Sequence, residues 1–475
     1  FVIGKSLSEI SETAVGLFTC DNDRFLRNWH EVSDKQIDFK CFDRNKSDNG
    51  SKYYPYNKGG GFRRWYGLNY LVVEYTNDGK EIRDYRKQSG QSWSLPGERF
   101  YFREGITWSG LTSSLNSFRW TSKGFIFESN KGQMLFTDDQ NYLLGFLSSL
   151  VCEKMVQLIN PTLSLQSNEI KKLAILYTKE KGMVSNNVSL LVSISKNDWN
   201  TYETSWDFQN NPLTVGWVSD SVTQQIEAKN VGLRDKAANP TYALSEIYAA
   251  WQTHNRATIL EMQRLEQENN RLFIDAYGLQ DELTPDVPLK QITLTVNPKY
   301  RYGGNLSDAD LNNRFQSDTL AELISYAIGC MMGRYSLDKA GLVYAHSGNV
   351  DFDTVYRSHA PRGNAAFDAR RPETENHENK PSHSFAPHDA ERLEMHSHAE
   401  HGNDSVSEIN NPTFAPDDDG IIPLTDQEWF ADDATHRFRE FIRVVWGEDN
   451  LQQNLDFVAE SLCLHVIKAK SGESS

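Results

Sequence analysis

The sequence predicts an α+β protein of several domains: a mainly β region over residues 1–225, a long-helix spacer over 226–345 and a small helical C-terminal region over 420–475. Three observations lead to this prediction. Short aromatic and β-branched runs broken by glycine fill the first 135 or so residues, a heptad pattern follows Leu244, and an acidic stretch begins at His346. With 475 residues, of which 38% are hydrophobic, the chain can bury two or three cores.

Two turns support the β assignment of the first region. The apolar run Tyr70–Tyr75 is followed by Asn77-Asp78-Gly79, a combination typical of a hairpin. A second turn, Asn130-Lys131-Gly132, lies between the apolar runs Gly124–Phe127 and Gln133–Phe136 and predicts another hairpin.

Helical spacing predicts two helices after the β region. Asn141–Ile159 predicts one helix, which Asn160-Pro161 ends. The heptad pattern predicts a long helix over 241–277, which begins after Asn239-Pro240 and ends at Gly278. Its core-like positions alternate in steps of four and three: Leu244, Tyr248, Trp251, Asn255, Thr258, Met262, Leu265, Asn269, Leu272 and Ala276. The two asparagines are suited to setting the register, and a spacer that packs on another helix is the expected role.

Charge is distributed unevenly along the chain. The net charge is -16. Most of it comes from residues 346–433, which contain 6 Lys+Arg and 19 Asp+Glu, whereas the rest of the chain contains 43 Lys+Arg and 46 Asp+Glu. Residues 50–135 reverse the balance, with 13 Lys+Arg and 7 Asp+Glu. The acidic total therefore does not exclude a nucleic acid as partner.

Residues 346–419 are expected to be a disordered, acidic, His-rich insert, because they have little apolar surface to offset the entropy of ordering. His396, His398 and His401 are close in sequence, but without an ordered scaffold no metal site is expected. The five cysteines are scattered without a C-x-x-C pair, and no run of about 18 apolar residues occurs. These features predict a soluble protein of the reducing cytoplasm, with no membrane span. The start at Phe1 suggests that the true N-terminus is missing.

Residues 50–135 are the expected DNA-binding surface. They include 18 aromatic residues among the 13 basic ones, a composition suited to gripping phosphates and stacking on bases. Most of the aromatic residues are expected in the core. The candidate DNA contacts are Arg63, Arg64, Arg103, Thr107, Trp108, Arg119 and Lys123. Arginine can bind guanine bidentately in the major groove, whereas lysine more often contacts a phosphate. Arg103 has an equal alternative, a buried ion pair with Glu104.

Seven collinear blocks carry a family resemblance. They are Asp21–Leu26, Arg63–Gly67, Phe102–Ser109, Tyr202–Phe208, Ala276–Pro285, Ile324–Asp338 and Phe438–Phe441. Through them the chain resembles the adenine-specific DNA methyltransferases of bacteriophage exclusion (BREX) systems. The resemblance implies a parent enzyme that uses S-adenosylmethionine, acts on double-stranded DNA and works with other BREX defence proteins.

The same resemblance implies a catalytic half with a glycine-rich S-adenosylmethionine loop and an Asn-Pro-Pro-Tyr/Phe motif. Neither is found. Gly59-Gly60-Gly61 lies in a polar loop. The segments that begin at Asn239, Asn297 and Asn411 each lack the second proline, and we interpret all three as structural. We therefore expect no catalytic or cofactor-binding residue in this chain and no activity by the chain alone. Because Cys463–Lys470 differs from the family pattern, we also expect a truncated C-terminal region.

Three functions stay open at this level. The first is the target-recognition and spacer portion of the methyltransferase, and an upstream reading frame with Asn-Pro-Pro-Tyr would favour it. The second is a non-enzymatic DNA-specificity or scaffold subunit of a defence complex. The third is a structural interaction protein that holds partners through the long helix and the acidic insert, and absence of DNA affinity would favour it.

Overall fold

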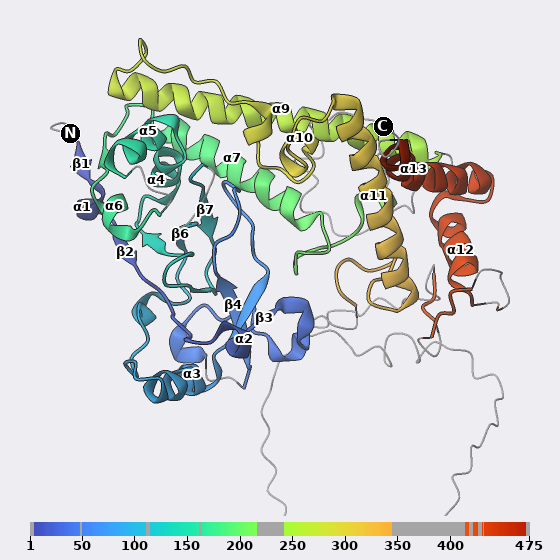
Figure 1. Ribbon diagram of the computed structural model, residues 1–475, viewed down its shortest axis with the longest axis horizontal. Coiled ribbons are helices and arrows are strands. Elements are labelled where there is room, and N and C mark those ends of the chain that lie inside the picture. Colours follow the sequence, from blue (N-terminus) through green and yellow to red (C-terminus); the bar gives the residue numbers. More distant parts are fainter. Residues whose placement is uncertain are drawn as a thin grey trace, which may run out of the picture.

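The computed structural model describes residues 4–47, 50–110, 115–160, 164–215, 242–343, 414–417, 421–425, 430 and 432–471. About half of the described chain is helical and the rest contains three small sheets, so the predicted α+β class is confirmed. Figure 1 shows the sheets on one side of the molecule and the long helix α9 (Leu244–Tyr277) across them. Helices α11 (Asp308–Met331), α12 (Ala434–Trp446) and α13 (Leu451–Ser471) lie on the other side.

Two four-stranded sheets form the β-rich part, in the orders β2-β9-β6-β7 and β3-β5-β4-β8. Among the described strand pairs only β4 and β8 are parallel. The strands of the first sheet are β2 (Glu12–Ala14), β9 (Met134–Phe136), β6 (Gly105–Trp108) and β7 (Phe118–Thr121). Those of the second sheet are β3 (Leu26–Asn28), β5 (Leu71–Glu74), β4 (Tyr53–Asn57) and β8 (Ile126–Phe127). A separate pair joins β1 (Lys5–Ser6) to β10 (Ala174–Ile175).

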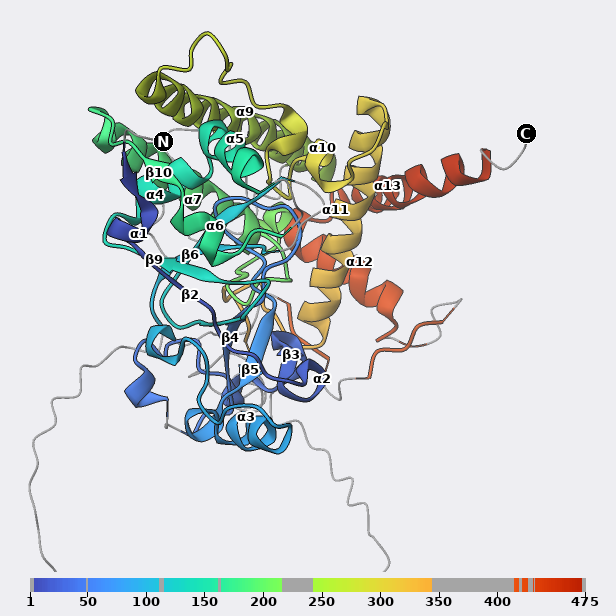
Figure 2. The ribbon, with the colours of Figure 1, turned by 60° about the vertical axis from the view of Figure 1, so that its left-hand side comes forward.

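The interior contains two hydrophobic cores. The larger core joins side chains of the first sheet to α9, α11 and α12. The smaller core joins the second sheet to α3 (Thr76–Gln88), to residues 95–102 and to the edge of the first sheet at Ala14, Met134 and Phe136. We call the second sheet, α3 and residues 89–103 the α3 lobe. Figures 1 and 2 show this lobe at the end of the molecule away from α9. The β-rich part and the helices therefore share one core, while the predicted boundaries at 225/226, 345/346 and 419/420 fall outside the described residues.

Both hairpin predictions are wrong. β5 pairs with β3 and β4, which precede it in the chain, and Asn77-Asp78-Gly79 leads into α3 instead of a returning strand. The turn Asn130-Lys131-Gly132 connects β8 to β9, which belong to different sheets. In both cases the edge of the strand pairs with a segment distant in sequence, and this long-range pairing overrides the local turn signal.

The predicted single helix Asn141–Ile159 is also wrong. The segment forms α4 (Gln140–Leu147) and α5 (Leu150–Ile159), which are bent by 65° at Ser148-Ser149. Ser149 is extended and its hydroxyl accepts a hydrogen bond from the amide of Cys152 at 3.2 Å, which caps the second helix. No single described helix is long and apolar enough to cross a membrane.

The predicted long helix is confirmed. α9 covers Leu244–Tyr277 and its heptad positions face the protein, with Asn255 and Asn269 both buried. Asn269 donates to the carbonyl of Gly145 in α4 at 2.9 Å, so one polar member of the pattern sets the position of α9 on the β-rich part. The helix packs on α5, α7 (Lys181–Asn200) and α13 rather than on one partner helix along its length.

The C-terminal helices contribute to the larger core. Their side chains Phe441, Ile442, Val445 and Val458 are buried, and Phe438 and Leu455 are partly buried. The predicted insert lies outside the described residues except for 414–417, where Phe414 is buried against Phe441 with ring centroids 5.6 Å apart.

Candidate nucleic-acid interface

The seven predicted DNA contacts are divided between the interior and the surface. Five of the side chains are buried: Arg63, Arg64, Thr107, Trp108 and Arg119. The other two, Arg103 and Lys123, are exposed. The buried five are engaged inside the protein, so in this conformation they offer little surface to a duplex.

Arg63 joins the β-rich part to α7. Its Nη2 donates to Asp198 Oδ2 at 2.9 Å, its Nη1 to Thr295 Oγ1 at 3.0 Å and its Nε to the carbonyl of Tyr66 at 2.7 Å. The guanidinium lies 5.0 Å from the ring centroid of Trp199, a cation–π distance. Arg63 therefore forms part of the interface between two elements.

Arg64 joins the β-rich part to α9. Its Nη1 donates to Glu266 Oε2 at 2.9 Å, and the indole of Trp65 donates to the other oxygen at 2.7 Å. Burial raises the pKa of Glu266, while its contacts with Arg64 and Trp65 act in the opposite direction. The carboxylate is thus compensated by a cation and an indole N–H from the same short segment.

Arg119 has no carboxylate within ion-pair distance among the described residues. Its guanidinium donates to the carbonyl of Arg63 at 3.1 Å and to the hydroxyls of Ser117 and Ser109 at 3.3 and 3.4 Å. Burial lowers the pKa of Arg119 to about 10, which leaves it charged at neutral pH. An uncompensated positive charge therefore lies inside the β-rich part.

Thr107 and Trp108 hold β6 in place. The hydroxyl of Thr107 donates to the carbonyl of Gln133 at 3.1 Å, and the indole of Trp108 donates to the carbonyl of Leu165 at 2.9 Å. At these two positions the block Phe102–Ser109 has a structural role in this conformation.

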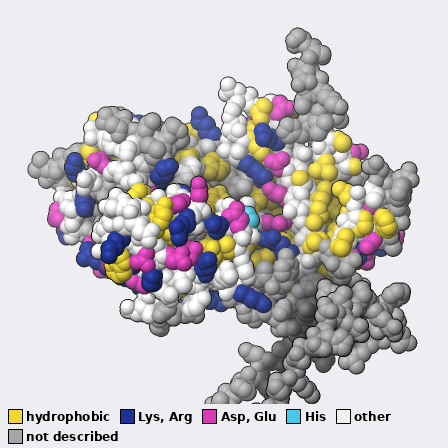
Figure 3. Space-filling model, turned by 60° about the horizontal axis from the view of Figure 1, so that its bottom comes forward, with side chains coloured by type: hydrophobic (Ala, Val, Ile, Leu, Met, Phe, Trp, Pro, Cys, Tyr) yellow, Lys and Arg dark blue, Asp and Glu magenta, His cyan; other side chains and the backbone are white. Residues whose placement is uncertain are grey.

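Arg103 and Lys123 remain the accessible members of the predicted set. The guanidinium of Arg103 lies 5.4 and 5.2 Å from the ring centroids of Phe100 and Phe136. The alternative of a buried ion pair with Glu104 is wrong, because Arg103 is exposed. Lys123 is exposed in the turn between β7 and β8. Figure 3 views the side of the α3 lobe, where Lys and Arg side chains lie in separate groups with Asp and Glu between them.

A cavity of about 630 Å³ opens where the β-rich part meets the end of α7 and α10 (Pro298–Arg301). We call it the junction cavity. Five aromatic side chains line it: Phe62, Tyr70, Trp199, Tyr202 and Tyr300. The hydroxyl of Tyr300 donates to the carbonyl of Phe62 at 2.6 Å, which fixes one ring of the wall. The hydroxyl of Tyr202 is buried without a hydrogen-bond partner, and burial raises the pKa of Tyr202 well above its usual value.

Cations also line the junction cavity. Lys290 is exposed and has no ion pair within the described part of the chain, whereas Lys299 contacts Asp308 at 3.1 Å. Arg301 contacts Glu322, the one carboxylate of the lining, at 2.8 Å. Arg63 forms part of the wall, and the charge of Arg119 lies close to Arg63, Tyr70 and Tyr300. Cationic and aromatic side chains thus converge on one hollow, where phosphates and the faces of bases could both be bound.

The sequence did not identify this cavity as a site. It did single out Asn297-Pro298-Lys299-Tyr300, but only as a structural segment. That interpretation holds for Asn297, whose side chain accepts a hydrogen bond from the amide of Lys299 at 3.2 Å at the start of α10. The same turn brings Lys299 and Tyr300 to the cavity. The comparable segments at Asn239 and Asn411 lie outside the described residues.

No group of three or more His, Cys, Asp or Glu side chains suited to a metal ion occurs among the described residues. His396, His398 and His401 lie outside them.

Comparison with known proteins gives two matches over nearly the whole chain, although no family model matches. The chain is 33% identical over 458 residues to the adenine-specific methyltransferase BrxX of Escherichia coli O9:H4 (strain HS), a match that covers 95% of the chain and 30% of the relative. It is 30% identical over 478 residues to the adenine-specific methyltransferase PglX of Lacticaseibacillus casei (strain Zhang). This match covers 99% of the chain and 31% of the relative.

These matches make the chain a relative of adenine-specific methyltransferases. It is homologous to the BrxX and PglX enzymes of BREX systems, so the resemblance predicted from the seven blocks is confirmed. The chain spans about 30% of the length of these curated relatives.

Proposed function

We propose that this chain is the DNA target-recognition and spacer portion of a site-specific N6-adenine DNA methyltransferase of a BREX phage-defence system. The proposal includes double-stranded DNA as its partner, other BREX proteins as further partners, and the cytoplasm as its compartment. S-adenosylmethionine and the catalytic residues belong to the remaining part of the parent enzyme, because the sequence of this chain contains no Asn-Pro-Pro-Tyr or Asn-Pro-Pro-Phe segment.

The junction cavity is the observation that carries the proposal. Proteins bind nucleic acids through cations that contact phosphates and through rings that stack on bases. The cavity combines both: Lys290 and Lys299 supply accessible cations at its rim, and the buried charge of Arg119, close to Tyr70 and Tyr300 of the wall, favours an anion. Arg103 and Lys123 add accessible cations on the β-rich part.

α9 supports the spacer role. With 34 residues it extends for roughly 50 Å, and hydrogen bonds attach it to other elements near both ends. The amide of Leu244 donates to Asn454 on α13 at 2.8 Å, and the hydroxyl of Tyr277 donates to the carbonyl of Ala174 at 2.8 Å. A helix held in this way keeps the β-rich part at a set distance from the C-terminal helices.

Salt-dependent binding of a labelled duplex by the purified chain tests the proposal. If four to six phosphates are contacted, log K falls against log[salt] with a slope of roughly -4 to -5. Lys290→Ala and Lys299→Ala are each expected to lower the slope by about one. Lys172→Ala is the matched control, since Lys172 is exposed and does not line the cavity. Absence of binding, or binding indifferent to salt, contradicts the proposal.

A further inference from the structure

We propose that the loop Lys87–Ser94 reads the DNA sequence from the major groove, with Gln88 and Gln91 as the side chains that contact base edges. The inference rests on the proposed function and deepens it, because it names the residues that determine specificity. In this arrangement the junction cavity holds the nucleic acid through charge and stacking, while exposed amide and hydroxyl side chains of the α3 lobe distinguish one sequence from another.

The exposure and composition of the loop support this role. All eight residues are exposed: Lys87 and Gln88 are the last two residues of α3, and the other six follow directly on its end. The loop reads Lys-Gln-Ser-Gly-Gln-Ser-Trp-Ser, and residues 85–97 include no Asp or Glu in a chain of net charge -16. Amide and hydroxyl side chains in a segment that itself holds no carboxylate are suited to hydrogen bonding at base edges close to phosphates.

Hydrogen bonds of the main chain hold the loop against the end of α3. The amide of Ser89 donates to the carbonyl of Tyr85 at 2.9 Å, and that of Gly90 to the carbonyl of Lys87 at 3.1 Å. Gly90, with a φ of +75°, lets the chain turn so that the amide of Gln91 donates to the carbonyl of Arg86 at 2.9 Å. The backbone is thus ordered while the side chains of Gln88 and Gln91 stay in solvent.

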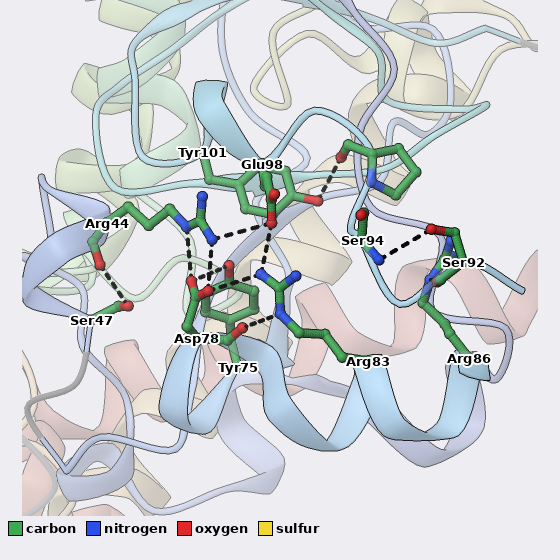
Figure 4. Close-up of polar contacts among 11 residues, drawn as sticks. Arg44, Ser47, Tyr75, Asp78, Arg83, Arg86, Ser92, Ser94, Glu98 and Tyr101 are labelled. Carbon is green, nitrogen blue, oxygen red and sulfur yellow. Dashed lines mark hydrogen bonds and ion pairs between the residues drawn. The ribbon is translucent and has the colours of Figure 1, made fainter. Parts of the chain in front are cut away.

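Two buried arginines, Arg83 and Arg86, hold the loop from the side of the protein interior (Figure 4). Arg86 donates from Nε to the carbonyl of Ser92 at 3.2 Å. Its Nη1 donates to the carbonyl of Phe18. The guanidinium of Arg83 lies 4.7 Å from the ring centroid of Trp93, whose side chain also hydrogen-bonds Asp84. An exposed tryptophan is therefore held in one orientation.

Asp78 anchors one of these arginines, Arg83, to the rest of the lobe. Arg44 Nε and the hydroxyl of Tyr75 both donate to Asp78 Oδ1 at 2.8 Å, and Arg83 Nη2 donates to Asp78 Oδ2 at 2.8 Å. Arg83 also contacts Glu98, which follows the loop, at 2.7 Å. Figure 4 shows these side chains converging on the left-handed turn that begins α3. Both ends of the loop are thereby tied to one ionic network, and a surface ordered in advance loses less entropy on binding.

The side-chain chemistry points to adenine-containing sites. The amide of glutamine can donate to and accept from N7 and N6 of one adenine, and serine can contact several bases. The major groove, about 12 Å wide, admits a helix, so the end of α3 and its loop can enter it together. Lys87, beside Gln88, is suited to the flanking phosphate.

Selection from a pool of duplexes with 14 randomised base pairs tests the inference. The wild-type chain is expected to enrich a motif that contains A·T pairs. The Gln88→Ala/Gln91→Ala variant should lose at least about tenfold of its preference for that motif over a scrambled duplex, with an unchanged melting temperature and salt slope. Gln453→Ala, which removes an exposed glutamine on α13, is the matched control and should select as the wild type does.

Two results overturn the inference: salt-dependent DNA binding by the wild type without enrichment of any sequence, and full preference retained by the double variant. Either leaves the proposed function standing. Failure of the wild type to bind any duplex contradicts the proposed function itself. Because Gln88 and Gln91 are exposed, the double variant is expected to fold, and its melting curve checks this.

Discussion

Buried arginines have different roles at the junction of the β-rich part with α7 and α9 and in the α3 lobe. At the junction, Arg63 and Arg64 are paired with Asp198 and Glu266, more than 130 and 200 residues away in sequence, and they join elements to one another. In the α3 lobe, Arg83 and Arg86 are also buried, but they support a loop whose own side chains face solvent. The number of basic residues in a segment therefore does not measure its basic surface.

The largest expected effect lies at the junction. Asp198→Ala removes the acceptor of Arg63 Nη2 and of the amides of Thr295 and Val296, and leaves a buried cation unpaired. We expect a loss of about 3–5 kcal/mol in the free energy of unfolding, measured by chemical denaturation. Lys123→Ala, on the surface, should change it by less than about 0.5 kcal/mol. A change below about 1 kcal/mol for Asp198→Ala would show that the pair is not structural.

A second prediction separates the two accessible cations. Arg103→Ala should lower discrimination between duplexes by roughly 1–3 kcal/mol if its guanidinium reads a base, with little change in melting temperature because the side chain is exposed. Lys123→Ala should instead weaken all sequences alike and lower the salt slope by about one. Competition binding with two duplexes at several salt concentrations distinguishes these outcomes. Equal behaviour of the two variants would contradict the assignment.

The network around Asp78 predicts a pH dependence for the α3 lobe. Burial alone would raise the pKa of Asp78, but hydrogen bonds from Arg44 and Tyr75 outweigh it, and the pKa is lowered. A carboxylate with a lowered folded-state pKa stabilises the fold above its unfolded pKa of about 3.9 and loses this contribution as the pH falls below that value.

Hydrogen exchange of residues 76–98 at pH 6 and pH 3 measures this effect. Because the Asp78 side chain is 41% exposed and solvent screens its ion pairs, we expect the wild type to lose about 1 kcal/mol of local stability. Asp78→Asn should show less protection at pH 6 and a smaller change with pH. The same pH response in both proteins would rule out this carboxylate as the source.

The last prediction is that S-adenosylmethionine does not bind to the isolated chain. Titration of the isolated chain with S-adenosylmethionine should give no binding heat at micromolar cofactor, because we propose that the cofactor site lies in the remaining part of the parent enzyme. Measurable micromolar binding would place the cofactor site within this chain and would require a new assignment of its portion of the enzyme.

The sequence predicted what depends on local periodicity. α9 was found from its heptad pattern, since one face of that helix packs along its whole length. The two hairpins were predicted wrongly because β5 and β9 pair with strands distant in sequence. The composition of residues 50–135 indicated a basic surface, but it cannot show that Asp198 or Glu266 folds back to neutralise an arginine. Trp199 and Tyr300 meet at the junction cavity only after folding.

The left-handed turn at the start of α3 has a consequence for how such chains diverge. Asn77, Asp78 and Gly79 have φ values of +50°, +55° and +71°, and a Cβ at position 79 would lie 2.7 Å from the ring of Tyr75. Few amino acids adopt such positive φ values without strain, so few substitutions are accepted at these positions. Residues 87–94, in contrast, are exposed, and substitutions there are usually within about 0.5 kcal/mol of neutral. The residues of the loop can therefore be exchanged one by one at little cost in stability, whereas the turn that supports it accepts few substitutions.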